Sequence, residues 1–325
     1  MVKICVASRE FGLCYPEALE ALKGVGELTL LTPLGRDIPL GALSDCDVLI
    51  IGDKPRLDGS ALAKLESLRV VALHAPSLDI MDLDAATDHG VIVLRPLDLI
   101  STSVAEHAIG LLLSLIRRLH EAYRLAKGGR WAERGRLLGR ELRGKTMGLI
   151  CLGCVGRELA RMADRGLGLK VLIYDPWVRS DEISGLGYEK VNLEDLLSSS
   201  DILSIQDPLP RKVRESVNEA VIKHLKRGCV ILDVTGGYTF KEGLLQELVE
   251  EGRIGGLALD VTEDFLLTNY RLLKHSNVIL TPALSHYTWE GLARVEAALV
   301  EDILKVLRGE RPSRVANPEV LKGKD

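Results

Sequence analysis

The residues with the clearest chemical potential lie in one short stretch near the middle of the chain. Three positions there are spaced as G-x-G-x-x-G, a pattern that lets a backbone turn approach a pyrophosphate, and they hold Cys151, Gly153 and Gly156. A carboxylate, Asp175, follows about 20 residues later, where an acid can bond a ribose 2′-hydroxyl. An apolar run precedes the turn and a helical pattern follows it. The stretch predicts a dinucleotide-binding βαβ unit.

The turn departs from this pattern at its first position. Cys151 replaces the first glycine, and its Cβ would narrow the space for a pyrophosphate. We expect the turn to contact the cofactor through backbone groups at the helix N-terminus, from Cys151, Gly153, Cys154, Val155 and Gly156. The alternative is a turn that keeps the fold and binds nothing. Asp175 favours NAD over NADP, because a 2′-phosphate would meet a carboxylate there.

Cys151 and Cys154 also form a C-x-x-C pair at the start of a helix, where the pKa of a thiol can be lowered. A redox role is one interpretation. We prefer the other, in which Cys151 packs under the turn and Cys154 faces the phosphates. No second His/Cys cluster accompanies the pair, so the sequence predicts no metal site.

Composition indicates a soluble, enzyme-sized protein. The 325 residues favour two domains, and 46% hydrophobic content is ample for two cores. The net charge of −4 gives no excess of basic residues of the kind that binds nucleic acid. The apolar run 108–116 is too short to span a bilayer, and no signal peptide precedes the first strand, so we expect a cytoplasmic location and no membrane partner. Six scattered cysteines indicate reduced thiols, and the charged content of 27% leans towards a thermophile.

Apolar runs and helical patterns alternate along the whole chain, which predicts parallel sheets with helices between the strands. The strands expected in the first hundred residues are 3–7, 47–52, 69–73 and 91–94, with helices over 15–23, 60–67 and 82–89. A long amphipathic helix follows, capped by Ser101 or Ser103 and continuing to Leu119. Residues 127–142 look like a loop. The second series has strands at 147–152, 171–175, 202–206, 230–234, 257–261 and 278–281, and a last helix over 288–307.

Several motifs in this order resemble the D-2-hydroxyacid dehydrogenase family, which includes phosphoglycerate, glycerate and formate dehydrogenases. The motifs are the fingerprint itself, GRELRGKTMGLI, VLIYDPWVR, SSSDILSIQDPL, EEGRIGGLALDV, NVILTP and the helix SVAEHAIGLLLSLIRR. The resemblance implies two doubly wound α/β domains. A flavodoxin-like substrate domain would contain residues 1–100 and 287–325, and an NAD-binding Rossmann domain would span 101–286, with the active site in the cleft between them.

The resemblance also implies binding partners. It implies NAD as cofactor, a small-molecule ligand such as an organic acid, and a homodimer that pairs through the Rossmann domain and its long helix. Further cofactor contacts are expected from Pro208, Thr235 and Asp260.

The family's catalytic side chains are missing where the resemblance would place them. The family arginine, which holds the substrate carboxylate, falls on Gly236, and a slip of one residue gives Thr235. The family histidine follows T-P, where this chain has Ala283. The glutamate that assists this histidine normally precedes a proline; here Glu263 or Asp264 occupies the place, or neither does.

The loop that would face the substrate also differs from the family pattern. Other residues become candidates to replace the missing catalytic side chains. Pro76 has no N–H and Ser77 carries a side chain where the family uses a glycine. His286 is a candidate for the proton-transferring group, and Arg95 for an anion anchor. A capping role for His286 and a solvated surface position for Arg95 are the plainer interpretations. His74 is a similar candidate near the loop, and Tyr238 would pack in the space an arginine uses.

These departures leave three interpretations of function. The first is a divergent oxidoreductase on the same cofactor, with its acid, base or substrate changed. The second is a catalytically inactive NAD-binding protein with a regulatory or interaction role. The third is an ordinary 2-hydroxyacid dehydrogenase in which the family's motifs fall in a different register, so that its catalytic residues lie at other positions.

Overall fold

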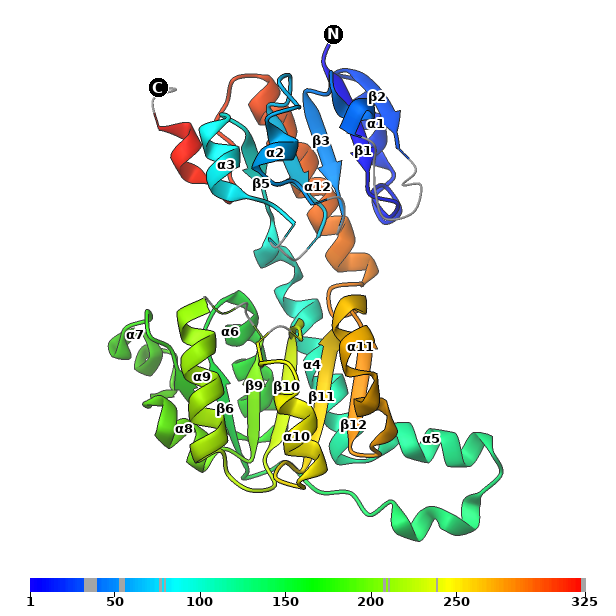
Figure 1. Cartoon of the computed structure of the whole chain (residues 1–325), viewed down its shortest axis with the longest axis vertical. Helices are drawn as coiled ribbons and strands as arrows, with labels where there is room; N and C mark the ends of the chain where they lie inside the picture. Colours follow the sequence, from blue (N-terminus) through cyan, green and yellow to red (C-terminus); the bar gives the residue numbers. More distant parts are fainter. Residues whose placement is uncertain are drawn as a thin grey trace. The chain divides into compact units, whose positions relative to one another are not determined.

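The structure is a computed structural model that describes residues 1–31, 40–52, 56–75, 78, 80–206, 209, 211–237 and 239–322. The chain forms two compact units. Unit 1 comprises Met1–Ile100 and Thr288–Asp325, and unit 2 comprises Ser101–Tyr287. Figure 1 labels the elements of both. Because the chain leaves unit 1, completes unit 2 and then returns, unit 1 is assembled from both ends of the sequence.

Unit 1 is built on a parallel sheet. Its described residues form five strands in the order β2-β1-β3-β4-β5, the order of the flavodoxin-like domain that the family resemblance implies. The strands are β1 (Lys3–Ala7), β2 (Glu27–Leu30), β3 (Val48–Ile51), β4 (Val70–Leu73) and β5 (Ile92–Leu94). The helices are α1 (Glu17–Lys23), α2 (Gly59–Leu62), α3 (Leu83–Asp88) and α12 (Trp289–Leu307), with short 3-10 turns η1 (Leu40–Leu43), η2 (Leu97–Ile100) and η6 (Pro318–Leu321).

Alternation along the strands sends side chains to two helical layers. Cys5 and Ala7 of β1 join one core cluster with residues of α2 and α3. The intervening side chains of β1 point to the opposite face, where α12 packs on β4 and α1 packs on α12. The period of two therefore also directs Ser8, the next residue after β1, and His74, the next after β4, towards the face that α12 covers.

A buried asparagine joins the last part of the chain to the edge of this sheet. The Asn317 side chain accepts a hydrogen bond from the Val93 N–H and donates to the Val91 carbonyl, at 2.9 Å each. It also donates to Thr87 of α3 at 3.1 Å. Val315 pairs antiparallel with Leu94. These bonds satisfy polar groups of β5 that would otherwise be buried and unpaired.

Unit 2 is built on a larger parallel sheet. Its described residues form seven strands in the order β12-β11-β10-β9-β6-β7-β8. The strands are β6 (Thr146–Ile150), β7 (Lys170–Tyr174), β8 (Glu189–Lys190), β9 (Ile202–Ile205), β10 (Val230–Gly236), β11 (Gly256–Val261) and β12 (Val278–Pro282). Because β7 lies on one side of β6 and β9 on the other, the strand order reverses between β6 and β9. Dinucleotides bind at the carboxyl ends of strands beside such a reversal.

Helices cover both faces of the unit 2 sheet. The helices after the β6 turn are α6 (Cys154–Arg161), the π-helical turn η4 (Met162–Gly166), α7 (Ser180–Gly185), α8 (Leu193–Ser199), α9 (Arg211–His224), α10 (Leu244–Glu250), α11 (Glu263–Asn269) and the 3-10 turn η5 (Tyr270–Lys274). Side chains of α8, α9 and α10 share one core cluster with the sheet. The long helix α4 (Ser101–Ile116) packs against α6, β10 and β11.

The apolar run 108–116, expected to be too short to cross a membrane, lies within a longer apolar segment. With the preceding turn, Leu97–Ile116 is long and apolar enough by length and composition alone. Its buried side chains include Val104, Leu111 and Leu112, which face the interior of the protein. A core helix passes the same test, and packing on β10 and β11 explains the apolar run.

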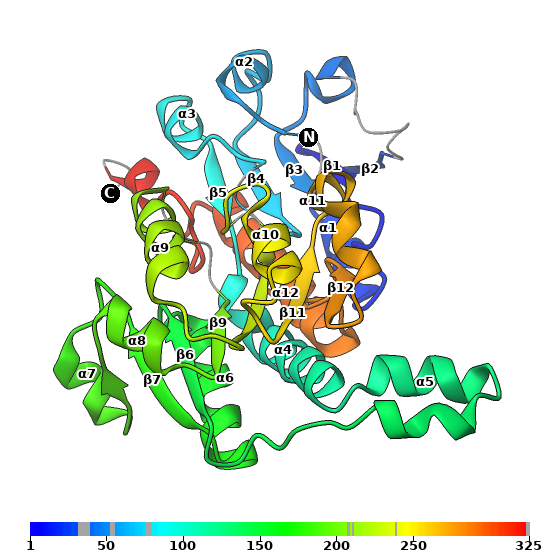
Figure 2. The ribbon, with the colours of Figure 1, turned by 60° about the horizontal axis from the view of Figure 1, so that its bottom comes forward.

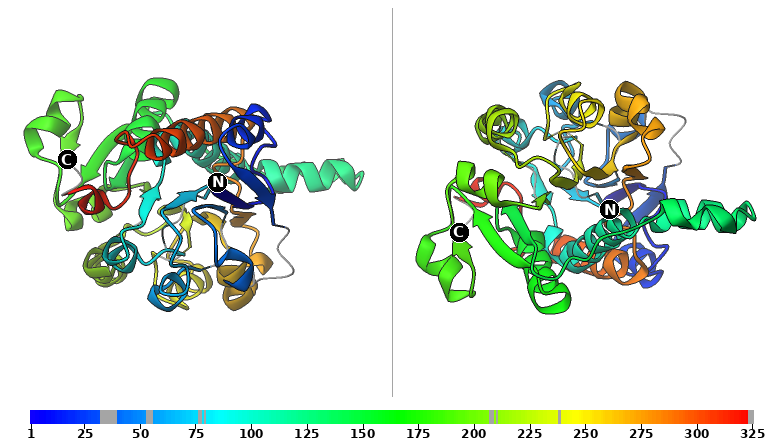
Figure 3. Two further views of the ribbon diagram at one scale, coloured as in Figure 1. Left: turned by 90° about the horizontal axis from the view of Figure 1, so that it is seen from above. Right: turned by 90° about the horizontal axis from the view of Figure 1, so that it is seen from below.

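The long helix also ends earlier than predicted. Arg118 takes a left-handed conformation, with φ of 52°, and separates α4 from a second helix, α5 (Leu119–Lys127). The stretch predicted as a loop, 127–142, contains a 3-10 helix η3 (Trp131–Arg136). Figures 2 and 3 show α5 projecting away from the seven-stranded sheet. Leu119 follows Leu115 at helical spacing across Arg118, so periodicity could not reveal the break.

The predicted strands lie where the structure has them, to within one or two residues at each end. The prediction of two parallel-sheet α/β units is confirmed. Two edge strands, β2 and β8, were not predicted. β2 is largely exposed and β8 has two residues, so neither carries an apolar run that alternation or length could identify.

Candidate functional site

The turn between β6 and α6 has the conformation that a glycine fingerprint requires. Cys151 has φ of 70°, in the left-handed region where glycine is favoured. Gly153 is the N-cap of α6. A Cβ on Gly156 would lie 2.9 Å from the Cys151 carbonyl oxygen and 2.9 Å from the Gln206 side chain, so this position needs a glycine. Cys151 therefore stands at a true glycine position.

Gln206, the residue after β9, ties this turn to the neighbouring strand. Its buried side-chain amide donates to the Cys151 carbonyl at 2.6 Å and to the Ile150 carbonyl at 3.2 Å. It therefore spans the place where the strand order reverses, between β6 and β9. The sequence pattern placed Gln206 in a strand and indicated no role for it. The feature of the sequence that could have identified Gln206 is a side-chain amide at the end of an apolar strand.

Asp175 directly follows β7, as predicted, but its carboxylate is buried and already accepts hydrogen bonds from the backbone. One carboxylate oxygen accepts from the Leu152 N–H at 2.8 Å, and the other accepts from the Trp177 and Val178 N–H groups. The residue is 2% exposed. A carboxylate offers about four acceptor positions. Three are used, so one remains for a ribose hydroxyl.

These groups fit a dinucleotide. The first turn of α6 presents the N–H groups of Cys154, Val155 and Gly156, and Gly156 allows close approach of the backbone. Cys154 is half-buried at the helix start, and Val155 is buried. Another predicted contact, Pro208, lies outside the described residues. Which atoms touch the cofactor stays a prediction.

The end of β10, where the resemblance places an arginine, is formed by two glycines with positive φ. Gly236 has φ of 99° and Gly237 has φ of 92°, after a shift in the register of β10 on β11. A Cβ on Gly237 would lie 2.5 Å from the ring of Phe265, which is buried on α11. A single Gly236→Arg exchange would therefore place a side chain in a backbone conformation that L-residues rarely adopt.

Asp233 lies beneath these glycines and is fully buried. One of its oxygens accepts from the Thr235 N–H at 2.8 Å and from the Thr235 hydroxyl at 2.7 Å. The other has no hydrogen-bond partner within the described residues. Burial raises the pKa of Asp233 to about 6, against hydrogen bonds from Thr235 that lower it. The sequence pattern did not reveal this carboxyl because it looked like the polar end of a buried strand.

Thr235 was predicted to touch the cofactor, but its polar groups have partners inside the protein. Its hydroxyl also lies 2.9 Å from the Thr239 hydroxyl. It organises the β10 turn around Asp233, and any cofactor contact would use its carbonyl or methyl group.

Asp260, at the end of β11, holds the turn that contains Ala283. Its carboxylate accepts from the N–H groups of Leu284 and Ser285 and from the Thr281 hydroxyl, at 2.6–2.9 Å. Ala283 consequently sits in a tight turn with φ of 53°. His107 of α4 lies 3.0 Å from the Thr281 hydroxyl and 3.8 Å from Asp260. The motif that contains His107 was noted in the sequence, but it indicated no role for this residue.

The candidate acid and base residues in unit 2 lie at a helix start and a turn. Glu263 and Asp264 are exposed in the first turn of α11, which Thr262 caps. Acidic side chains there interact favourably with the helix N-terminus. His286 is half-buried and its ring meets that of Tyr287 edge-on, with centroids 6.2 Å apart. Their catalytic assignments stay predictions.

Other candidates belong to unit 1 or lie outside the described residues. Arg95 follows β5 and is half-buried, and its N–H donates to the Arg314 carbonyl. His74 follows β4 and is buried. Pro76, Ser77 and Tyr238 lie outside the described residues.

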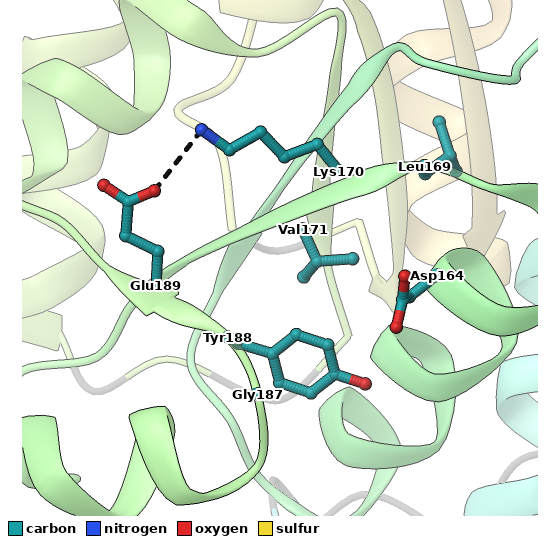
Figure 4. A pocket seen from close by; sticks show the side chains of 7 residues that line it. All are labelled: Asp164, Leu169, Lys170, Val171, Gly187, Tyr188 and Glu189. Atoms are coloured by element: carbon teal, nitrogen blue, oxygen red, sulfur yellow. Dashed lines mark ion pairs between the residues drawn. The ribbon is translucent and has the colours of Figure 1, made fainter.

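One surface pocket lies at the opposite end of the unit 2 sheet. Figure 4 shows the side chains that line it. The cavity has a volume of about 350 Å³ and lies between the start of β7 and β8. Lys170 and Glu189 form an ion pair of 3.3 Å across its rim, and both are largely exposed. Because Lys170 begins β7 whereas the fingerprint lies at the carboxyl ends of the strands, this pocket is separate from the cofactor region.

Two parallel sheets and a glycine turn at the strand reversal define an α/β protein with a dinucleotide-binding unit. The family model "D-isomer specific 2-hydroxyacid dehydrogenase, NAD binding domain" matches residues 109–285, more than half of the chain. The chain belongs to the D-isomer specific 2-hydroxyacid dehydrogenase family, an NAD-binding oxidoreductase family, and its cofactor is NAD. The predicted family and cofactor are both confirmed.

The similar proteins include enzymes that are named for different substrates. D-3-phosphoglycerate dehydrogenase of Methanocaldococcus jannaschii is 33% identical over 98% of this chain and 60% of its own length. Glyoxylate reductase of Korarchaeum cryptofilum is 30% identical over 89% of this chain and 88% of its own length. D-lactate dehydrogenase of Aquifex aeolicus, solved with NAD and lactic acid, is 26% identical with a TM-score of 0.84, covering 99% of this chain and 98% of that one. The chain thus spans only 60% of the first of these relatives.

Asp233 makes stability depend on pH. A carboxyl whose folded pKa is raised binds protons more readily when folded, so the free energy of unfolding should fall as the pH rises from about 4 to about 6. Asp233→Asn keeps an acceptor for Thr235 and removes the charge. We expect it to raise the free energy of unfolding at pH 7 by up to about 3 kcal/mol, and by little below pH 4. Urea unfolding at several pH values measures this.

Asp201→Asn is a matched control in the same unit. Burial raises the pKa of Asp201, but hydrogen bonds from the Thr146 N–H and from Lys226 outweigh it and lower the pKa overall. This variant should lose stability at neutral pH and approach the wild type as the pH falls. An equal response of the two variants would contradict the assignment to Asp233.

Proposed function

We propose that this chain is a divergent NAD-dependent oxidoreductase of the family, acting on a small organic acid or related carbonyl compound with acid–base groups that differ from those of the family. The carrying observation is a contrast between two strand ends at the carboxyl edge of one sheet. The β6–α6 turn retains a dinucleotide cradle, whereas the arginine position at Gly236 is a glycine with φ of 99°. The names of the relatives support the substrate class.

The residues of unit 2 would bind and orient the cofactor. The N–H groups at the start of α6 would hold the pyrophosphate, with Asp175 on the adenosine ribose. NAD supplies hydride transfer when bound. Gln206 and Asp260 keep the surrounding turns in place through bonds to the Cys151 carbonyl and to the Leu284 and Ser285 N–H groups.

Substrate binding must follow a different pattern from a simple 2-hydroxy acid. Gly236 offers no guanidinium for a carboxylate, and Ala283 offers no proton. Arg95 is the proposed anion anchor, because it directly follows β5 at the carboxyl edge of unit 1. A cytoplasmic location and a thermophilic source stay predictions.

Cofactor choice is the first test. We expect NADH to bind at least about tenfold more tightly than NADPH, since Asp175 would oppose a 2′-phosphate. Fluorescence titration of the whole chain with both cofactors measures the ratio. Asp175→Asn should narrow it, whereas Asp201→Asn should leave it unchanged. Tighter binding of NADPH by the wild type would overturn the assignment.

Substrate assays test the reaction itself. We expect oxidation of lactate, glycerate and 3-phosphoglycerate with NAD to fall far short of the roughly 1–10³ s⁻¹ of ordinary enzymes. Gly236 stands where the family has an arginine, and Ala283 where it has a histidine. Each missing side chain should lower the rate by a large factor, about 10²–10⁴ for one acid–base group. Assays over a panel of 2-oxo acids with NADH complete the test. Ordinary rates on a simple substrate would indicate a conventional dehydrogenase, and NADH binding without any turnover would favour the regulatory alternative.

Oligomeric state is a further prediction, and we propose a homodimer. The projecting segment from α5 to Leu138 exposes large apolar side chains, with Tyr123, Trp131 and Leu138 at 66%, 70% and 87% exposure. Such a surface on a projecting arm fits a partner of the same kind. Light scattering at micromolar concentration should give a dimer, and Trp131→Glu with Leu138→Glu should give a monomer. A monomeric wild type would contradict this proposal.

A further inference from the structure

A buried carboxyl of unit 2, Asp233 on β10, has an oxygen that the surrounding chain leaves unbonded. Its Oδ1 accepts from both the N–H and the hydroxyl of Thr235. Within the described residues, the Oδ2 is buried and has no hydrogen-bond partner. Leaving a buried polar atom unpaired is unfavourable, and more so when the atom carries charge. The ionised form of Asp233 is therefore the form that this site accommodates least well.

Asp233 lies where β10 leaves the regular ladder of the sheet. The register of β10 on β11 shifts between Asp233 and Gly236. The β10 turn, residues 235–237, follows directly, and both of its glycines have positive φ. The two hydrogen bonds from Thr235 to the Asp233 carboxyl cross this irregular part of the strand. They therefore fasten the β10 turn to the end of the regular strand.

The β10 turn stands at the same edge of the sheet as the dinucleotide turn. β10 is parallel to β9, and β9 is parallel to β6, so the carboxyl ends of all three strands share one edge. A dinucleotide spans the point where the strand order reverses, with one half on each side. Asp175, the expected ribose ligand, follows β7 on the far side of β6. The other half of NAD is therefore expected over β9 and β10.

Few charged groups surround Asp233. Burial raises its pKa to about 6, hydrogen bonds from two threonine hydroxyls and one backbone N–H lower it, and the charge of Asp260 raises it. β9 (Ile202–Ile205) carries no charged side chain. The titratable groups on the other elements nearby are Asp260 of β11, His107 of α4, and the exposed Glu263 and Asp264 of α11. Among these, Asp260 is the group whose charge acts on Asp233.

We propose that Asp233 is a positioning residue for the cofactor: when neutral it holds the β10 turn in the form that binds NAD, and when ionised it loosens that turn. The buried anion lacks donors for its Oδ2, and opening of the turn to water supplies them. Two successive glycines permit such a movement, because neither has a side chain that restricts the backbone. The affinity for NAD then falls as the pH rises through about 6. The proposal rests on NAD binding by unit 2 and requires no particular substrate.

A purely structural role is the plainer explanation of the same contacts. In that case ionisation of Asp233 lowers the stability of unit 2 as a whole and leaves the affinity of the folded protein for NAD unchanged. The positioning role instead changes the β10 turn locally, in protein that is still folded. The two explanations therefore differ in cofactor affinity and in local hydrogen exchange, both of which can be measured without any turnover.

The first experiment is fluorescence titration of the whole, folded chain with NADH from about pH 5 to about pH 8. We expect the wild-type Kd to rise several-fold over this range. The upper limit is about 10²-fold, because the pKa of Asp233 lies about two units above that of an exposed aspartate. Asp233→Asn has no charge to gain, so its Kd should stay near the value that the wild type has at pH 5.

Asp201→Asn is the matched control for this titration. Asp201 precedes β9 at the opposite edge of the sheet, where it accepts from the Thr146 N–H. This variant should follow the wild-type pH profile. A wild-type Kd that changes by less than about twofold overturns the positioning role, and so does an Asp233→Asn variant that keeps the wild-type profile. If NADH binding follows the expected profile and no substrate reacts, the proposed function fails and the positioning role stands.

The second experiment measures amide hydrogen exchange in the wild type without cofactor, so it depends on no variant. The Thr235 N–H donates to Asp233 and is protected while the β10 turn is closed. After correction for the intrinsic effect of pH, exchange at residues 235–237 should become about tenfold faster between pH 5 and pH 7. Exchange in β6 should not change, and NADH should restore the protection of the turn. An equal acceleration in β6 would show a global loss of stability and overturn the proposal, as would an unchanged rate at 235–237.

Discussion

The close approach of helix α6 to strand β6 is the contact on which the rest of unit 2 depends. Gly156 has no room for a side chain because the Cys151 carbonyl and the Gln206 amide occupy that space. Gln206 bonds the same carbonyl and thereby fastens β9 to the turn. Any larger residue at 156 would push the helix away and open the reversal between β6 and β9. Close packing, rather than a ligand, therefore already enforces the shape of the cradle.

Cys151 shows what this constraint tolerates. A side chain in the left-handed region is unfavourable by roughly 1–2 kcal/mol, yet Cys151 is buried in the unit 2 core and recovers stability through packing. The end of β10, at the same carboxyl edge, is built differently. Gly236 and Gly237 have positive φ, a Cβ on Gly237 would meet the Phe265 ring, and the buried Asp233 keeps one oxygen unpaired within the described part of the chain. The turn after β6 thus has the geometry of a dinucleotide-binding turn, whereas positions 236 and 283 hold Gly and Ala.

The local sequence pattern predicts the buried strands and the glycine turn of this protein. It does not predict the surroundings of its buried polar groups. Apolar runs separated by helical periods locate the buried strands, and a glycine spacing locates the turn, because both are properties of neighbouring residues. The enclosure of Asp175 by three N–H groups and the raised pKa of Asp233 depend on how the folded chain surrounds each carboxyl. His74 could be noticed for its position after a strand. Its contact with Glu296 of α12 could not, because more than two hundred residues separate the partners.

The return of the chain to unit 1 has a consequence for how the protein is made. Unit 2 is one continuous stretch, Ser101–Tyr287, and can fold as soon as that stretch has left the ribosome. Unit 1 must wait, because α12 supplies one of its helical layers and Asn317 completes the bonds of β5. During synthesis, β1 to β5 therefore stand with one apolar face uncovered until α12 has been made. Throughout that interval the uncovered face of this sheet is open to aggregation with other nascent chains.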